Sequence, residues 1–83
     1  MYIHLGSDEV VPIDQVIAIL NIEPPLSAAL KEIVDLGIAE RNLYPICERE
    51  RAKTLVITTG KMYLSPISSL TLYKRSRIGY GEG

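Results

Sequence analysis

Residues 43–60, LYPICERERAKTLVITTG, constrain the fold of this chain more than any other stretch. Two apolar runs rich in β-favouring residues, 43–47 and 54–58, enclose a charged segment whose single apolar residue is Ala52. Strand-forming runs on either side of a polar segment are typical of a β-hairpin with a solvated tip. We therefore expect a long hairpin here, with the charged segment at its end.

Three cations recur at every second position of the charged segment: Arg49, Arg51 and Lys53. An extended backbone sends alternate side chains to opposite faces, so these cations would share one face, with Glu48 and Glu50 on the other. A row of cations of this kind can contact the phosphates of a nucleic acid. A charged hairpin tip that faces only water gives the same spacing, and both interpretations stay open at this point.

The charges of the chain are segregated, although their formal total is only −1. Residues 1–40 carry seven carboxylates and one cation, a net charge of −6, whereas residues 41–77 carry eight cations and two carboxylates, a net charge of +6. Fields of clustered charges extend over a Debye length of about 8 Å. We expect the basic half to attract a polyanion or the acidic half of a second copy, unless folding interleaves the two halves into an ordinary surface.

A chain of 83 residues has a marginal core of its own, so association with further copies is expected to stabilise it. The apolar fraction of 47% is ample for a globular fold, and we expect one domain over residues 1–78 and a flexible tail over residues 79–83. No apolar run approaches the roughly 18 residues of a membrane span, and the N-terminus lacks the features of a signal peptide. These observations predict a cytoplasmic protein that makes no membrane contact.

The N-terminal part is predicted to form three strands. Residues 2–5 and 9–12 make a hairpin about Gly6, because glycine supplies the positive φ that a tight turn needs. Residues 15–22, QVIAILNI, are almost continuously apolar, which predicts a strand buried on both faces. Two buried helical turns are the alternative for this run, and its β-branched content favours the strand.

One helix is predicted with a clear beginning and a clear apolar face. Residues 24–25 are both proline and end the preceding strand, and Ser27 is a suitable N-cap. Apolar positions then recur at spacings of three and four: Leu26, Leu30, Ile33, Val34 and Gly37 or Ile38. The helix is expected to cover residues 27–40 and to end before residue 42.

The C-terminal part is predicted to add a turn at residues 59–61, a strand at residues 62–65 and a last helix at residues 70–77, capped by Ser68 or Ser69. The fold class is therefore α+β. A small curved antiparallel sheet is expected to pack against the central helix, with the C-terminal helix at a sheet edge or a subunit interface.

No group of residues has the spacing of a catalytic or metal site. His4 has no carboxylate or cysteine at a diagnostic spacing, Cys47 is the single cysteine, and no glycine belongs to a phosphate-binding loop. Neighbouring carboxylates such as those of Asp8 and Glu9 more often solubilise a surface than act as an acid and a base. The five tyrosines follow no pattern of a single-strand binder and are expected in the core or at an interface. We predict no enzyme: no catalytic residue, cofactor, metal or small-molecule substrate.

Several segments occur in an order that resembles a known family. They are the opening YIHLG followed by VIAIL, the midpiece SAALKEIVDLG, the charged RERAKTLVIT and the closing MYLSPISSLTLYKR. Over residues 1–77 they resemble the small bacterial extracellular matrix regulatory proteins of the RemA/RemB type, and MYIHLG with the LSP-like segment is closer to the RemB members. The resemblance implies a DNA-binding regulator of biofilm-matrix genes that forms ring-shaped homo-oligomers, with a fold likened to the LytTR DNA-binding domain.

The resemblance also implies which residues contact DNA. RemA-type chains carry an adjacent pair of arginines just before the long apolar strand, where this chain has Arg49, then Glu50, then Arg51. The first arginine is matched and the second is replaced. A glutamate beside a phosphate lowers affinity unless the hairpin directs it to the other face.

We therefore expect a set of cations to contact duplex DNA, mainly through its phosphates: Arg49, Arg51, Lys53, Lys74 and Arg75. Partners implied by the resemblance are further copies of the chain in a ring and a RemA-like paralogue. The opposite charges of the two halves favour a head-to-tail contact that closes as a ring. The alternative function is an oligomeric scaffold or protein-partner module without DNA binding, in which salt bridges between subunits occupy the hairpin cations.

Overall fold

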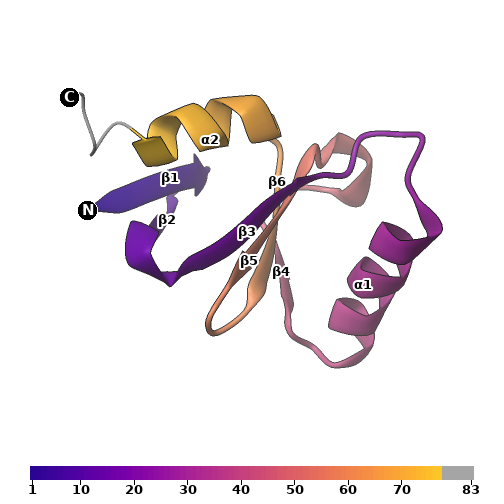
Figure 1. Ribbon diagram of the computed structural model, residues 1–83. Coiled ribbons are helices and arrows are strands. Elements are labelled where there is room, and N and C mark those ends of the chain that lie inside the picture. Colours follow the sequence, from indigo (N-terminus) through magenta and orange to yellow (C-terminus); the bar gives the residue numbers. More distant parts are fainter. Residues whose placement is uncertain (78–83) are drawn as a thin grey trace.

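The computed structural model describes residues 1–77 and confirms the α+β class (Figure 1). The flexible tail expected at residues 79–83 lies outside the described residues. In chain order the elements are β1 (Tyr2–Gly6), β2 (Glu9–Pro12), the 3-10 helix η1 (Ile13–Gln15), β3 (Val16–Asn21), α1 (Ala28–Ala39), β4 (Leu43–Pro45), the 3-10 helix η2 (Arg49–Arg51), β5 (Thr54–Thr58), β6 (Met62–Ser65) and α2 (Ser69–Arg77).

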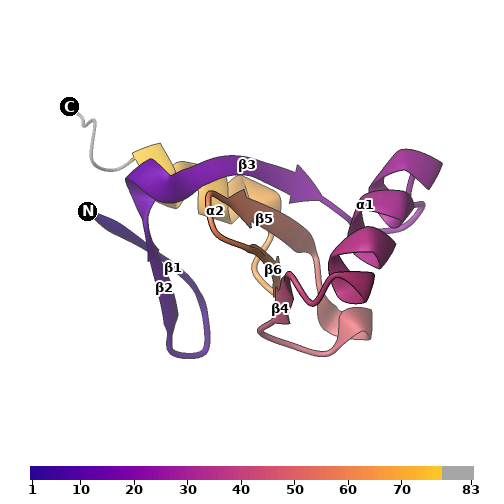
Figure 2. The ribbon, with the colours of Figure 1, turned by 90° about the horizontal axis from the view of Figure 1, so that it is seen from below.

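Four of the strands form one sheet in the order β3-β5-β6-β4, and β1 and β2 form a separate hairpin. β5 is antiparallel to both of its neighbours, whereas β4 runs parallel to β6. The sheet is therefore mixed, not wholly antiparallel as predicted. Figures 1 and 2 show it between α1 on one side and the β1–β2 hairpin with α2 on the other.

The predicted burial of the third strand is wrong in the folded chain. β3 lies at an edge of the sheet, and the side chain of Ile17 is 66% exposed. The strand covered on both faces is β5, because β3 and β6 pair with its two edges and apolar groups lie above and below it. An apolar run therefore identified a strand here but not its place in the sheet.

The long hairpin predicted from residues 43–60 is also wrong. β4 and β5 flank opposite edges of β6, so the segment between them carries the chain past the end of β6 instead of turning it back on itself. Backbone hydrogen bonds attach both ends of this segment to β6: the Ile46 amide donates to the Leu64 carbonyl oxygen at 3.0 Å, and the Lys53 amide donates to the Ser65 carbonyl oxygen at 2.9 Å. The hairpin that does form joins β5 to β6 through residues 59–61.

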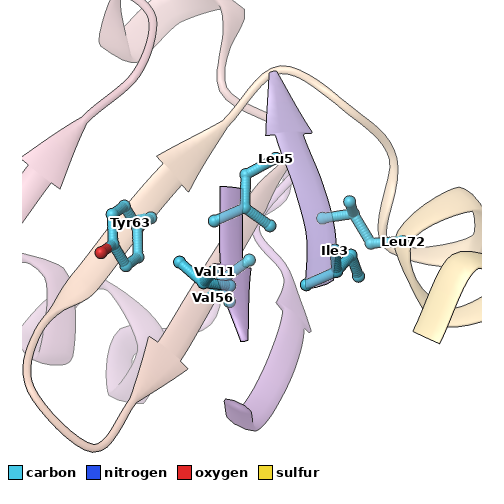
Figure 3. Packing of buried hydrophobic residues seen from close by; sticks show 6 residues of the cluster. All are labelled: Ile3, Leu5, Val11, Val56, Tyr63 and Leu72. Atoms are coloured by element: carbon cyan, nitrogen blue, oxygen red, sulfur yellow. The ribbon is translucent and has the colours of Figure 1, made fainter. Parts of the chain in front are cut away.

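The two faces of the sheet bury two separate apolar clusters, because successive side chains of β5 and β6 alternate between them. Val56 pairs with Tyr63 on the face that meets the β1–β2 hairpin and α2, and Leu55 pairs with Leu64 on the face that meets α1. Figure 3 shows the first cluster: Ile3, Leu5, Val11, Val56, Tyr63 and Leu72. Each fully buried side chain of this size contributes about 1.5–3 kcal/mol to folding.

Helix α1 begins where the sequence predicted, since the Ser27 hydroxyl accepts a hydrogen bond from the Leu30 amide at 3.1 Å. Its apolar face is narrower than predicted. Val34 and Gly37 are buried, whereas Ile38 is 54% exposed, so α1 covers its cluster with only part of the expected stripe. The C-terminus of α1 closes with the Arg41 amide donating to Ile38 and the Asn42 amide donating to Gly37, as in a Schellman motif.

Candidate functional site

The structure separates the predicted DNA-contacting cations into three groups. Arg49 lines a pocket beside β4, which we call the arginine pocket: Ile38, Arg41, Leu43, Pro45, Arg49 and Leu64. Arg51 and Lys53 line a different one, the mixed-charge pocket: Glu23, Pro24, Glu50, Arg51, Ala52, Lys53 and Pro66. Lys74 and Arg75 lie on α2, across the sheet from α1 (Figure 1). The row of cations on one face is therefore not formed within a single chain.

Arg49 and Arg51 are separated because residues 49–51 form one turn of 3-10 helix instead of an extended strand. The Arg51 amide donates to the Glu48 carbonyl oxygen at 2.9 Å, and the Ala52 amide donates to the Arg49 carbonyl oxygen at 3.2 Å. A 3-10 helix has about three residues per turn, so successive side chains point about 120° apart. Arg49, Glu50 and Arg51 accordingly leave the turn in three different directions.

Apolar residues and two arginines line the arginine pocket. Its volume is about 450 Å³, and four of its six lining residues are apolar. Arg41 follows the C-terminus of α1 and Arg49 begins η2, so two segments eight residues apart supply the charges. The sequence indicated Arg41 only as one charge of the basic half, not as a site residue. Its place directly after the predicted end of the helix at residue 40 is the signal that could have identified it.

Arg41 has a left-handed backbone conformation, with φ at +57°. Glycine is the usual residue at this position of a Schellman motif, because a side chain there costs about 1–2 kcal/mol. The structure thus places an arginine where the backbone favours a glycine, and it does so at the rim of the arginine pocket.

The two oppositely charged halves of the sequence do not neutralise each other within the described chain. Among the side chains of residues 1–76 the one salt bridge joins Lys31 to Asp35 at 3.2 Å, and both belong to the acidic half. Arg41 and Arg49 are exposed and have no carboxylate of the described residues within salt-bridge distance. Arg41 and Arg49 are thus available for an external anion or for the acidic half of another copy.

The two cations of α2 differ in their surroundings. Lys74 is exposed, whereas Arg75 is half-buried and its guanidinium donates a hydrogen bond to the His4 carbonyl oxygen at 3.0 Å. Arg75 therefore helps to attach α2 to β1, and only part of its hydrogen-bonding capacity is left for a ligand.

The described tyrosines divide between the core and the surface. Tyr63 belongs to the core at 6% exposure, whereas Tyr2 and Tyr44 are exposed, and their predicted place at an interface stays a prediction. The rings of Tyr44 and Tyr63 meet edge to face with centroids 5.8 Å apart, and the Lys61 ammonium lies 5.0 Å from the Tyr44 centroid. This contact places a further cation beside β4, on the opposite face from Leu43 and Leu64.

Residues suited to catalysis or metal binding are not brought together in the described part of the chain, where no three side chains of His, Cys, Asp and Glu are grouped for a metal ion. The ring nitrogen Nε2 of His4 donates to the Ser7 carbonyl oxygen at 2.6 Å. Cys47 is half-buried, and burial raises the pKa of its thiol, an effect that the nearby Arg51 guanidinium opposes. Neither described helix is long and apolar enough to cross a membrane.

Known proteins resemble this chain over almost its whole length. Residues 2–76 match the RemA-like family, described as extracellular matrix regulatory protein A-like. The chain is also 34% identical over 77 residues to extracellular matrix regulatory protein B of Bacillus subtilis (strain 168), an alignment that covers 93% of this chain and 91% of that protein. The family match includes β4, η2 and both arginines of the arginine pocket.

Proposed function

The chain belongs to the RemA-like family of extracellular matrix regulatory proteins, and from this we propose that it regulates matrix genes by binding duplex DNA as a ring-shaped homo-oligomer. The proposal rests on Arg49, which by the resemblance corresponds to the first arginine of the RemA-type pair. It is exposed, and none of the described carboxylates lies within salt-bridge distance of it.

Arg49 is proposed as the principal phosphate contact, with Arg41 beside it. A guanidinium presents donors in a planar fork that matches two oxygens of one phosphate. Arg51 and Lys53 are exposed and are proposed to add weaker contacts, because Glu23 and Glu50 line their pocket. Lys74 and Arg75 belong to α2 and are proposed as contacts to a more distant part of the DNA backbone.

Assembly would multiply these weak contacts. β3 is an open sheet edge with Ile17 exposed, and α1 exposes Leu36, so the single chain leaves apolar surface that a neighbouring copy can cover. A closed ring repeats Arg49 at equal intervals, and contacts that are weak singly then act together on one duplex. Recognition through phosphates depends on the shape and bendability of the DNA more than on base edges.

Fluorescence anisotropy with a labelled duplex of promoter length, at several stated salt concentrations, tests the DNA-binding proposal. The Arg49→Ala/Arg51→Ala variant is expected to bind about tenfold or more weakly and to show a flatter dependence of log affinity on log salt. Lys31→Ala is the matched control, because it removes one exposed cation from the acidic half at a distance from η2. Equal affinity of the double variant and the control would overturn the assignment of the contact surface.

Light scattering coupled to size exclusion tests assembly separately. The proposal expects one species larger than a monomer in the wild-type chain and in the double variant, and a larger monomer fraction in high salt if opposite halves attract each other.

The second candidate function is a scaffold without DNA binding, which the exposed apolar residues of β3 and α1 favour. An intact oligomer that binds no duplex at low salt would support the scaffold.

A further inference from the structure

We propose that the arginine pocket binds a small amphiphile, a molecule with one anionic head group and an alkyl chain. The head group would lie between Arg41 and Arg49, and the chain would lie on the apolar walls. At about 450 Å³ the pocket falls within the roughly 300–1,000 Å³ that is usual for small-molecule sites. Nothing in the DNA-binding proposal requires a pocket with apolar walls.

Charge complementarity supports an anionic head group. Two arginines line one pocket, and none of the described carboxylates lies within salt-bridge distance of either. An anion that contacts both would be attracted by two positive charges that no carboxylate of the described chain neutralises. The two parallel N–H donors of a guanidinium match two oxygens of a carboxylate or of a phosphate, so the geometry allows either head group.

The backbone of Arg41 gives a second, independent argument. Its φ of +57° is costly for any side chain, and such strained positions gather at functional sites. Hydrogen bonds from the Arg41 and Asn42 amides hold this backbone to the last turn of α1. The guanidinium of Arg41 is therefore presented from a fixed backbone position rather than from a loose loop.

The walls explain why the ligand should carry an alkyl chain. Leu64 is buried in the cluster beneath α1, and Leu43 packs against the same cluster, so the base of the pocket belongs to the rigid sheet. Ile38 stands at the rim with 54% of its surface exposed. An alkyl chain that covered Ile38 would remove this apolar surface from water, which free phosphate or acetate cannot do.

A ligand in the arginine pocket would also control DNA binding, a consequence that rests on the proposed function. Arg49 lines the pocket and is also the principal phosphate contact proposed above. A bound anionic head group would occupy its guanidinium, so ligand and DNA would compete for one side chain. The amphiphile would then release the protein from DNA.

The direct test measures binding of decanoate to the full chain by isothermal titration in the absence of DNA, below the concentration at which decanoate forms micelles. Saturable binding at one site per subunit is expected. Acetate supplies the head group alone, and decyltrimethylammonium supplies the same chain length with a positive head group. Both are expected to bind at least about tenfold more weakly than decanoate. Decyl phosphate in place of decanoate distinguishes a phosphate head group from a carboxylate.

Two variants locate the site without endangering the fold. Arg41→Gly removes one guanidinium and puts the preferred residue at a left-handed position, so the fold is expected to be at least as stable. Ile38→Gln makes one exposed wall polar. Each variant is expected to weaken decanoate binding about tenfold, whereas Lys31→Ala leaves it unchanged.

The proposal is overturned if decanoate shows no saturable binding, if the cationic amphiphile binds as well, or if both variants bind like the wild type. It is also overturned if binding disappears as the protein concentration rises, because a neighbouring copy then covers the pocket. DNA binding is measured in parallel with the wild-type chain. Saturable decanoate binding by a chain that binds no duplex would support the ligand site and reject the proposed function. DNA binding without decanoate binding would support the proposed function and reject the ligand site.

Discussion

Arg49 and Arg51 are two residues apart in the sequence, yet they line different pockets of the folded chain. Arg49 shares its pocket with Arg41 and with no carboxylate, whereas Arg51 shares its pocket with Glu23 and Glu50. The 3-10 turn at residues 49–51 is the cause, because it rotates each successive side chain by about 120°. The two arginines are therefore expected to contribute unequally to the binding of anions.

The first prediction compares single variants at these two positions. Arg49→Ala is expected to weaken binding of a duplex by more than Arg51→Ala, by about threefold to tenfold, because neighbouring carboxylates already attract the Arg51 charge. Anisotropy titrations of both variants at one low salt concentration check this order. Equal losses, or a larger loss for Arg51→Ala, would show that the pockets do not determine the contribution of each cation.

The second prediction concerns Glu50, which lies between the two arginines of η2. Glu50→Gln removes an exposed negative charge beside the proposed phosphate contacts and is expected to tighten DNA binding about twofold to fivefold at low salt. The gain should shrink as salt screens the charge. Glu32→Gln makes the same chemical change on α1 and is expected to leave affinity unchanged, so a gain of equal size in both variants would contradict a local effect of Glu50.

The third prediction uses two glycines that begin similar turns. Gly6 has φ at +128°, and an added methyl group would meet Pro66 at 3.2 Å, whereas a methyl group on Gly60 would meet nothing within 4 Å. Gly6→Ala is expected to lower the free energy of unfolding by about 1–3 kcal/mol, and Gly60→Ala by less than about 0.5 kcal/mol. Urea unfolding at one fixed protein concentration measures both values. A loss at Gly60 as large as that at Gly6 would contradict the backbone argument.

The fourth prediction concerns the contact that joins the β1–β2 hairpin to the sheet. The buried Ser65 hydroxyl donates to the Leu5 carbonyl oxygen and accepts from the Ile67 amide at 3.1 Å. Ser65→Ala leaves a buried acceptor without its donor and is expected to cost about 1–3 kcal/mol of unfolding free energy. Thr59→Ala, at an exposed position in the β5–β6 turn, serves as the control in the same urea series and is expected to change stability by less than about 0.5 kcal/mol.

Local signals in the sequence predicted most of the elements. Ser27 indicated the start of α1, Gly6 indicated the first turn, and apolar runs rich in β-favouring residues indicated the strands. Each of these signals acts within a few residues along the chain, through a capping hydrogen bond, a backbone angle or a local preference for extended backbone. The order of several sequence segments also indicated the family that the comparisons then established.

The partners of each strand could not be obtained in the same way. The apolar runs at residues 43–47 and 54–58 both satisfy the pattern of a hairpin, but each pairs with β6, on opposite edges. Pairing is decided by which arrangement buries the two apolar clusters together, and that depends on contacts between residues far apart in the chain. A spacing rule that assumed an extended backbone then failed at residues 49–51, where the chain turns past β6.

The sequence by itself determined the α+β class, the beginning of each helix, the turns and the opposite charges of the two halves, because short-range backbone preferences and composition decide these properties. Tertiary structure alone decided that β5 lies inside the sheet, that Arg49 lies with Arg41 instead of Arg51, and that no ion pair among the side chains of residues 1–76 joins the two halves. The physical reason is that side-chain direction and charge pairing depend on where the backbone passes in space.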